Sequence, residues 1–188
     1  NWIEQNINDG TMQNVRHLWS SVRPNGPKRP HSLDRLELRI CDFISNIDLL
    51  LAITAFLELR VISLFDHLDS LDPLSSSKFS LDELKDICDQ NELKVSKDSL
   101  NAELIHWKNG EKIICKDWIQ NLLKDLSISS RTLAMNHFLE PIHKVLKEGN
   151  ESMKWIDKYK QGLSVEDIMR SAIHNMIKNE EENNLWFK

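Results

Sequence analysis

The chain has 188 residues, of which 40% are hydrophobic and 28% charged, and its formal net charge at pH 7 is −5. This composition is typical of a globular protein long enough to bury a core, and the acidic balance gives no general attraction to nucleic acid. We therefore do not expect a nucleic-acid-binding protein. The longest apolar or neutral run, residues 49–57, is far shorter than the roughly 20 residues needed to cross a bilayer, so we do not expect a membrane protein either.

The first predicted element is a strand over residues 35–40, where charged and apolar side chains alternate. The two-residue period of a strand places Arg35, Glu37 and Arg39 on one face. Residues 18–22 are expected to pair with it, across a connection that contains the turn-forming residues 24–27. A solvated antiparallel strand gives the same alternation, so the pattern alone leaves open both a functional site and ordinary cross-strand charge pairing.

A long helix is predicted next, within residues 43–68, because residues 47–65 are apolar at helical spacing. Ser45 or Asn46 is expected to cap it, with Asp48 in the first turn at the positive end of the helix dipole. The apolar sequence predicts that this helix is buried. The Ser-rich segment 69–78 that follows, with its single Pro, is predicted to be a loop.

The rest of the chain reads as helices separated by clear signals. Ser80 and Glu83 have the spacing of a capping box that opens a helix of about a dozen residues. Asn109-Gly110 predicts a type I′ hairpin turn. Helices are expected over residues 117–126, 130–147 and 164–179, with a kink or junction at Pro141 and a helix end at Gly149. The predicted class is mainly α, an α+β fragment: a helical bundle-like region with one short antiparallel strand pair and a small hairpin.

Other chemistry-bearing residue types give no site. The seven histidines show no His-x-x-x-His pair, and an isolated His is usually structural or on the surface. Trp107, Trp118 and Trp155 are expected to be packing residues. The three cysteines are far apart, which indicates neither a zinc site nor a disulfide framework and suits a reducing cytoplasm.

The segment Asp34–Phe65 resembles the last active-site strand and following helix of the glutamine synthetase superfamily. The better match is the carboxylate–amine ligase branch, because Leu36-Glu37-Leu38-Arg39 followed by Asp42 is similar to its Leu-Glu-x-Arg-x-x-Asp strand. Segments on either side resemble glutamate–cysteine ligases of the cyanobacterial type: residues 10–19, 22–27, 101–107, 116–119, 146–150 and 161–162. The resemblance therefore covers nearly the whole chain.

The resemblance implies an ATP-dependent ligase that joins glutamate to cysteine and uses Mg²⁺. Glu37 would correspond to a metal ligand, and Arg39 to the arginine that faces the transferred phosphate or the glutamate carboxylate. Arg35 is a weaker candidate for the nucleotide, and Arg23 is the better of two upstream basic candidates because it faces the same way as Trp19 and Ser21. Carboxylates that hold Mg²⁺ and guanidinium groups that bind phosphate oxygens are the groups that phosphoryl transfer needs.

The resemblance also implies that the chain is the C-terminal part of a longer ligase, because an early acidic strand of that family has no counterpart here. The start at Asn1 rather than Met agrees with an excised piece. Residues 1–68 would then be the last active-site strands and buried helix, and residues 69–188 a helical C-terminal region packed with them. The expected partners are glutamate, cysteine and the missing N-terminal part, and the oligomeric state stays open. Alternatives are a ligase with another amine substrate and a non-catalytic helical interaction module.

Overall fold

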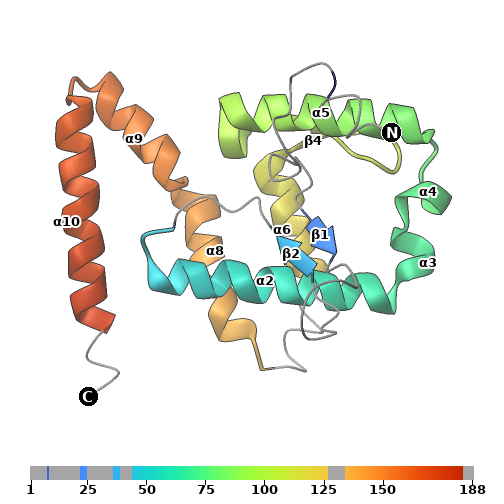
Figure 1. Ribbon diagram of the computed structural model, residues 1–188, viewed down its shortest axis with the longest axis horizontal. Coiled ribbons are helices and arrows are strands. Elements are labelled where there is room, and N and C mark those ends of the chain that lie inside the picture. Colours follow the sequence, from blue (N-terminus) through green and yellow to red (C-terminus); the bar gives the residue numbers. More distant parts are fainter. Residues whose placement is uncertain (1–7, 9–21, 25–35, 39–43, 127–133, 184–188) are drawn as a thin grey trace. The chain divides into compact units, whose positions relative to one another are not determined.

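The computed structural model describes residue 8 and residues 22–24, 36–38, 44–126 and 134–183. The chain forms two compact units, residues 1–44 and residues 45–188. Helices make up most of the described chain (Figure 1), and the strands occur as two antiparallel pairs. The predicted mainly α class, with a short strand pair and a small hairpin, is confirmed.

The first unit contains the strand pair β1 (Val22–Pro24) and β2 (Leu36–Leu38). The strands are antiparallel, and the register places Arg23 opposite Glu37. The predicted strand is therefore confirmed at its centre, whereas residues 18–21, 35, 39 and 40 lie outside the described residues. Pro24 ends β1, where a residue without a backbone N–H is tolerated.

The second unit contains the remaining helices and the second strand pair. In chain order these are α2 (Ile47–Asp66), α3 (Leu68–Leu71), α4 (Pro73–Ser76), α5 (Leu81–Asp98), the 3₁₀-helix η2 (Ser99–Asn101), β3 (Glu103–Ile105), β4 (Lys112–Ile114), α6 (Cys115–Asp125), α8 (Asn136–Glu148), α9 (Glu151–Lys160) and α10 (Val165–Asn183). Among these described helices, none is long and apolar enough to span a membrane.

Helix α2 begins where the sequence predicts, with Asn46 as its cap: the Asn46 Oδ1 accepts a hydrogen bond of 2.8 Å from the Leu49 N–H. The prediction that the whole helix is buried is wrong. One face packs against α8, while apolar side chains such as Leu50, Leu51 and Phe65 are exposed. The sequence places apolar residues around more of the helix than α8 covers. By its contacts α2 belongs to the second unit, and the predicted functional division after residue 68 stays a prediction.

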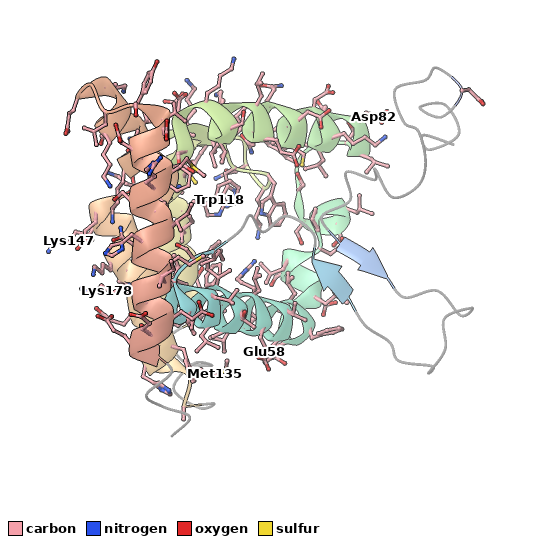
Figure 2. The ribbon with its side chains drawn as sticks, turned by 60° about the vertical axis from the view of Figure 1, so that its left-hand side comes forward. Glu58, Asp82, Trp118, Met135, Lys147 and Lys178 are labelled. Carbon is pink, nitrogen blue, oxygen red and sulfur yellow. The ribbon has the colours of Figure 1, made fainter. Side chains whose placement is uncertain are left out.

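Two clusters of buried side chains form the core of the second unit. The larger joins α2, α6 and α8, and the smaller lies around η2, β3 and the start of α6. Trp118, which Figure 2 labels, packs against the smaller cluster and is a packing residue as predicted. The larger cluster consists of Ala52, Ala55, Leu59, Leu123, Leu126, Leu139 and Ile142, and the smaller of Leu100, Ala102, Leu104 and Cys115.

The capping box at Ser80 is confirmed, since the Ser80 Oγ accepts from the Glu83 N–H and the Glu83 carboxylate accepts from the Ser80 N–H. The helix is longer than predicted, at 18 residues. The predicted loop over residues 69–78 is wrong in part, because it contains most of α3 and all of α4. Asp72 caps α4 through its side chain, and Pro73 occupies the first helical position, where its missing N–H costs nothing.

The predicted hairpin is confirmed as β3 and β4, but its turn differs from the prediction. Residues 106–111 connect the strands, so the turn is longer than the two residues of type I′. The Gly110 N–H donates to the His106 carbonyl at 2.8 Å, and Gly110 has a φ of +74°, which a residue without a Cβ adopts readily.

The C-terminal helices also depart from the predictions in places. Helix α8 continues through Pro141, so Pro141 is not a junction between two helices. Gly149 ends α8 with a φ of +86°, as predicted. Helix α9 was not predicted, although Asn150 caps it by accepting from the Met153 N–H at 3.0 Å. Helix α10 runs to Asn183, beyond its predicted end at residue 179.

Candidate functional site

The strand pair β1–β2 carries two of the four predicted site residues. Its register sets Arg23 directly opposite Glu37, with Val22 opposite Leu38 and Pro24 opposite Leu36. Residues that lie opposite one another in an antiparallel pair share a face, with Cβ atoms about 4.5–5.5 Å apart. An arginine and a glutamate position therefore share one face of this pair, and apolar positions alternate with them on the other.

The other two predicted site residues, Arg35 and Arg39, lie outside the described residues, directly before and after β2. The sequence predicted residues 18–22 as the partner strand and gave no register. The structure pairs residues 22–24 with residues 36–38 and places Arg23 opposite Glu37. The register comes from the backbone, and the roles assigned to all four residues stay predictions.

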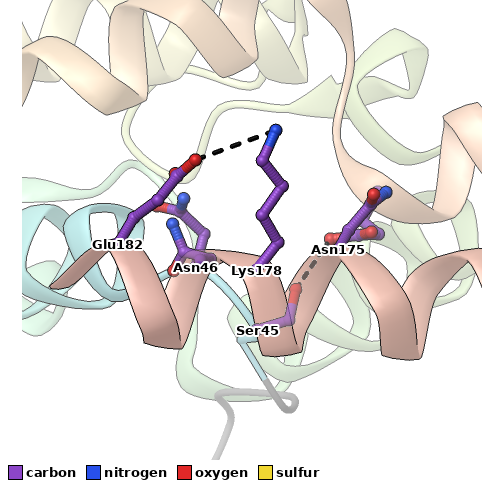
Figure 3. Close-up of a pocket in the computed structure, with 7 residues that line it drawn as sticks. Ser45, Asn46, Asn175, Lys178 and Glu182 are labelled. Carbon is purple, nitrogen blue, oxygen red and sulfur yellow. Dashed lines mark hydrogen bonds and ion pairs between the residues drawn. The ribbon is translucent and has the colours of Figure 1, made fainter. Parts of the chain in front are cut away.

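A pocket of about 270 Å³ lies elsewhere, in the second unit, where the start of α2 meets α9 and α10 (Figure 3). Its polar groups largely pair with one another. The Ser45 hydroxyl donates to the Glu151 carboxylate at 3.2 Å, and Lys178 forms an ion pair of 3.7 Å with Glu182. The lining residues are Ser45, Asn46, Glu151, Asn175, Lys178, Asn179 and Glu182.

Sequence reasoning did not find this pocket, because its residues come from three separate segments and carry no common motif. Ser45 and Asn46 were identified only as helix caps. The Asn179 Oδ1 accepts from the Ile47 N–H at 3.2 Å, so one lining residue of α10 also completes the start of α2. The lining side chains connect the ends of three helices. Most of them therefore have a structural role.

His106 contacts two indole rings. It stacks on Trp107, with ring centroids 5.8 Å apart, and lies tilted against Trp118 at 4.9 Å. Burial is the main cause that lowers the pKa of His106, which favours the neutral ring, and its Nδ1 accepts from the Lys108 N–H at 3.2 Å. This histidine is structural, as predicted.

The surroundings of the two described cysteines disfavour the thiolate form. Cys88 and Cys115 are free thiols, and burial raises the pKa of both. A raised pKa disfavours the thiolate, the form that attacks electrophiles and binds zinc. Within residues 44–126 and 134–183 and the other described positions, no three His, Cys, Asp or Glu side chains gather as a metal site would require. The assignment of Mg²⁺ to Glu37 is therefore still untested.

Comparison with known proteins decides the family. The model of glutamate-cysteine ligase family 2 (GCS2) matches residues 1–179. The chain belongs to this family. A curated relative, named "Putative glutamate--cysteine ligase 2", from Sorangium cellulosum (strain So ce56), is 20% identical over 173 residues, which are 92% of this chain and 43% of the relative. The chain thus spans less than half the length of that relative. No solved structure matches the chain significantly.

The family match covers the charged strand and nearly all of the helical unit. It therefore includes Arg23, Glu37 and Arg39, the positions that the resemblance singled out, and it leaves out only the last nine residues, 180–188. The family agrees with the one expected from the sequence.

Proposed function

We propose that this chain is the C-terminal part of an ATP-dependent glutamate–cysteine ligase of the cyanobacterial type, which forms γ-glutamylcysteine for glutathione synthesis. The observation that carries the proposal is the register of β1–β2, which sets Arg23 against Glu37 within a chain that belongs to glutamate-cysteine ligase family 2. An acidic and a basic position on one face of a strand pair supply two of the groups that phosphoryl transfer needs.

The role proposed for each site residue comes from the family resemblance and agrees with the chemistry of its side chain. Glu37 offers carboxylate oxygens, the ligands that Mg²⁺ prefers, and would hold the ion in the complete enzyme. Arg39 and Arg23 offer planar guanidinium groups that match the oxygens of phosphate or carboxylate in pairs. Arg35, two positions before Glu37, would contact the nucleotide. Mg²⁺, when bound, neutralises charge on the phosphates of ATP.

The proposed reaction has two steps. A carboxylate oxygen of glutamate attacks the γ-phosphorus of ATP, a new O–P bond forms and ADP leaves, and the product is an acyl phosphate. The amine of cysteine then attacks the acyl carbon, an amide bond forms, phosphate leaves and the amine loses a proton. In both steps Arg39 and Arg23 would hold negative oxygens in place as charge moves between them.

The site needs more groups than the described strand pair supplies. A divalent cation takes several oxygen ligands, and Glu37 is the one carboxylate of β1–β2. We therefore assign the other ligands to an N-terminal part of the same ligase, with residues 1–68 as its last active-site strands and following helix. Residues 69–188 would be its helical C-terminal region. Free thiols at Cys88 and Cys115 support a cytoplasmic location.

The direct test is to express the complete open reading frame that contains this chain and to assay the protein for ADP release. We expect release to require glutamate and cysteine together with Mg²⁺. Release with glutamate and a different amine, but not with cysteine, would favour a carboxylate–amine ligase of other specificity. No release with any amine would contradict the proposal and favour a non-catalytic interaction module.

A second measurement concerns residues 1–188 alone. Because the described strand pair offers only part of a metal and nucleotide site, isothermal titration with millimolar MgATP should give weak binding or none. Micromolar binding, or ADP release by the isolated chain, would mean that the nucleotide site lies elsewhere than on β1–β2.

A further inference from the structure

Pro24 determines which residues of β1 and β2 are bonded to each other. In an antiparallel pair, opposite residues alternate between a hydrogen-bonded pair, which exchanges two N–H···O bonds, and a pair that exchanges none. Pro24 lies opposite Leu36 and has no N–H to donate, so these two residues cannot exchange two bonds. The bonded pair is therefore the adjacent one, Arg23 with Glu37.

The two strands consequently differ at their outer edges. The residues on either side of a bonded pair direct their N–H and C=O groups away from the partner strand. On β2 these residues are Leu36 and Leu38, and each has both a donor and an acceptor. On β1 they are Val22 and Pro24, and Pro24 lacks the donor. A strand beside β2 can form a full ladder, whereas a strand beside β1 would miss a hydrogen bond, and proline within sheets is confined mainly to such edges.

We propose that the outer edge of β2 receives a strand from the N-terminal part of the ligase, and that β1 is the last strand on its side of the sheet. This inference rests on the proposed function, which assigns residues 1–188 to the C-terminal part, and it specifies where the two parts meet. Among the residues that the structure describes, this sheet contains only β1 and β2. Two strands of three residues are at best marginally stable in water by themselves, so they need a neighbouring strand.

The charges of the strand pair indicate the chemistry of the added strand. Arg23 and Glu37 lie opposite one another, and the alternation in the sequence continues with Arg35 and Arg39 on either side of Glu37. Three arginines and one glutamate give this set an excess of positive charge. Opposite charges on neighbouring strands stabilise a sheet, and like charges destabilise it. The added strand should therefore carry carboxylates on the face of Glu37, where they would also be further oxygen ligands for Mg²⁺.

The residues of this chain that precede β1 do not meet that requirement. Residues 1–21 contain two acidic side chains, Glu4 and Asp9. Successive side chains of a strand point to opposite faces, so two positions separated by an odd number of residues cannot share a face. No strand formed from residues 1–21 would therefore present two carboxylates beside Glu37, and this favours the N-terminal part of the ligase as the source.

Amide hydrogen exchange, measured residue by residue in the complete protein that contains this chain, tests the proposal. The N–H groups of Leu36 and Leu38 should exchange at least about 100-fold more slowly than an unprotected amide, because they donate to the added strand. The matched control is Val22, which lies opposite Leu38 and directs its N–H to the outer edge of β1. Its N–H should exchange at close to the unprotected rate. Protection of Val22, or its absence at Leu36 and Leu38, would overturn the proposal.

The same measurement on residues 1–188 alone identifies the source of the strand. Without the N-terminal part, Leu36 and Leu38 should lose their protection. Protection retained at every protein concentration would assign the strand to this chain, and protection that grows with concentration would assign it to a second copy; either result overturns the proposal. Exchange rates do not depend on the reaction catalysed, so a complete protein that is inactive but protected at Leu36 and Leu38 would contradict the proposed function and not this inference.

A matched pair of proline substitutions in the complete protein provides a second test. Leu38→Pro removes a donor from the edge that bonds to the added strand, whereas Val22→Pro removes a donor from the free edge of β1. Val22 and Leu38 lie opposite one another, so the two changes affect the same face of the strand pair. Urea denaturation should show that Leu38→Pro lowers the midpoint at least about twice as much as Val22→Pro. An equal or larger loss for Val22→Pro would overturn the proposal.

Discussion

The two strand pairs in the described part of the chain look alike in sequence and differ in the contacts that stabilise them. Both are antiparallel, both have three residues per strand, and both combine charged with apolar positions. In β3–β4 the charges form an ordinary surface ion pair: the Lys112 ammonium lies 2.7 Å from the Glu103 carboxylate, and both side chains are well exposed. An exposed ion pair of this kind contributes little to stability, because water screens it.

The pair β3–β4 is also fixed by its surroundings. Leu104 is buried in the smaller core cluster, and Asn91 of α5 binds the outer edge of β3 by accepting from the Ile105 N–H at 2.8 Å and donating to its carbonyl at 2.9 Å. Alternating charge on a short strand therefore needs no functional explanation here. The alternation of charged and apolar residues in β1–β2 is therefore evidence for a site only if replacing its charged residues affects activity and replacing Glu103 or Lys112 does not.

Replacing the acid of each pair gives the largest expected difference. In the proposed complete ligase, Glu37→Gln keeps the size of the side chain and removes the charge that would bind a hard cation, so the rate of ADP release should fall by at least about 100-fold and recover only in part with excess Mg²⁺. Glu103→Gln removes a surface carboxylate and should leave the rate within about twofold. Equal rates in the two variants would show that both pairs are structural.

Replacing the bases sharpens the same comparison. Arg39→Lys and Arg23→Lys keep the positive charge but lose the planar group that binds two oxygens at once, and each should lower kcat/KM by about 10- to 100-fold. Lys112→Arg on β4 is the control and should change kcat/KM little. A normal rate for Arg39→Lys would mean that this position contributes only charge.

Local signals in the sequence predicted most elements, because they depend on neighbours in the chain. The capping box at Ser80, the cap at Asn46 and the helix end at Gly149 each involve residues within four positions of one another. Helix α9 carried a comparable signal in Asn150 and was missed. The one-turn helices α3 and α4 were missed because Ser-rich segments with a Pro are usually loops.

Features that depend on distant residues could not be predicted in the same way. The burial of α2 was overestimated because the sequence shows which side chains are apolar but not how much of the helix a neighbour covers. The clamp of Asn91 on Ile105 joins residues 14 positions apart, and the pocket joins the start of α2 to α9 and α10. For the candidate site, the strand containing Glu37 was predictable, whereas its register with Arg23 came only from the structure.

Removing the clamp on β3 should give the largest effect on stability among the changes considered. Asn91→Ala leaves the N–H and the carbonyl of Ile105 without their partner, and we expect the free energy of unfolding to fall by about 1–3 kcal/mol. Urea denaturation followed by circular dichroism measures it. Asn121→Ala, at an exposed position of α6, is the control and should be nearly neutral. An equal effect in both variants would show that the clamp contributes nothing.

Replacing Gly149 tests the junction between α8 and α9. Its φ of +86° and ψ of +157° lie in a region that is open almost only to glycine. A Cβ there would meet the side chain of Met153 at an ordinary 3.6 Å, so the cost of Gly149→Ala is conformational, about 1–2 kcal/mol. Gly162→Ala is a useful comparison, because Gly162 also has a positive φ, of +97°, and no neighbour within 4 Å. Similar losses in the two variants would confirm that backbone conformation, and not packing, sets the cost.

The smallest expected effect is a pH dependence at the start of α5. The pKa of Glu83 is lowered from its ordinary value of 4.5, mainly because its carboxylate accepts a hydrogen bond from the Ser80 N–H and a second from the Ser80 hydroxyl. A lowered pKa in the folded state means that the capping box stabilises fully above the ordinary value and that its contribution is lost as the pH falls through the lowered one. The difference in unfolding free energy between the native chain and Glu83→Gln should therefore shrink as the pH falls below the ordinary value of 4.5, since the uncharged amide has no proton to take up. Asp82→Asn, on the neighbouring residue of the same turn, keeps the Ser80–Glu83 bonds and should retain the pH dependence of the native chain. A difference that stays constant with pH would mean that the Glu83 charge adds nothing to the cap.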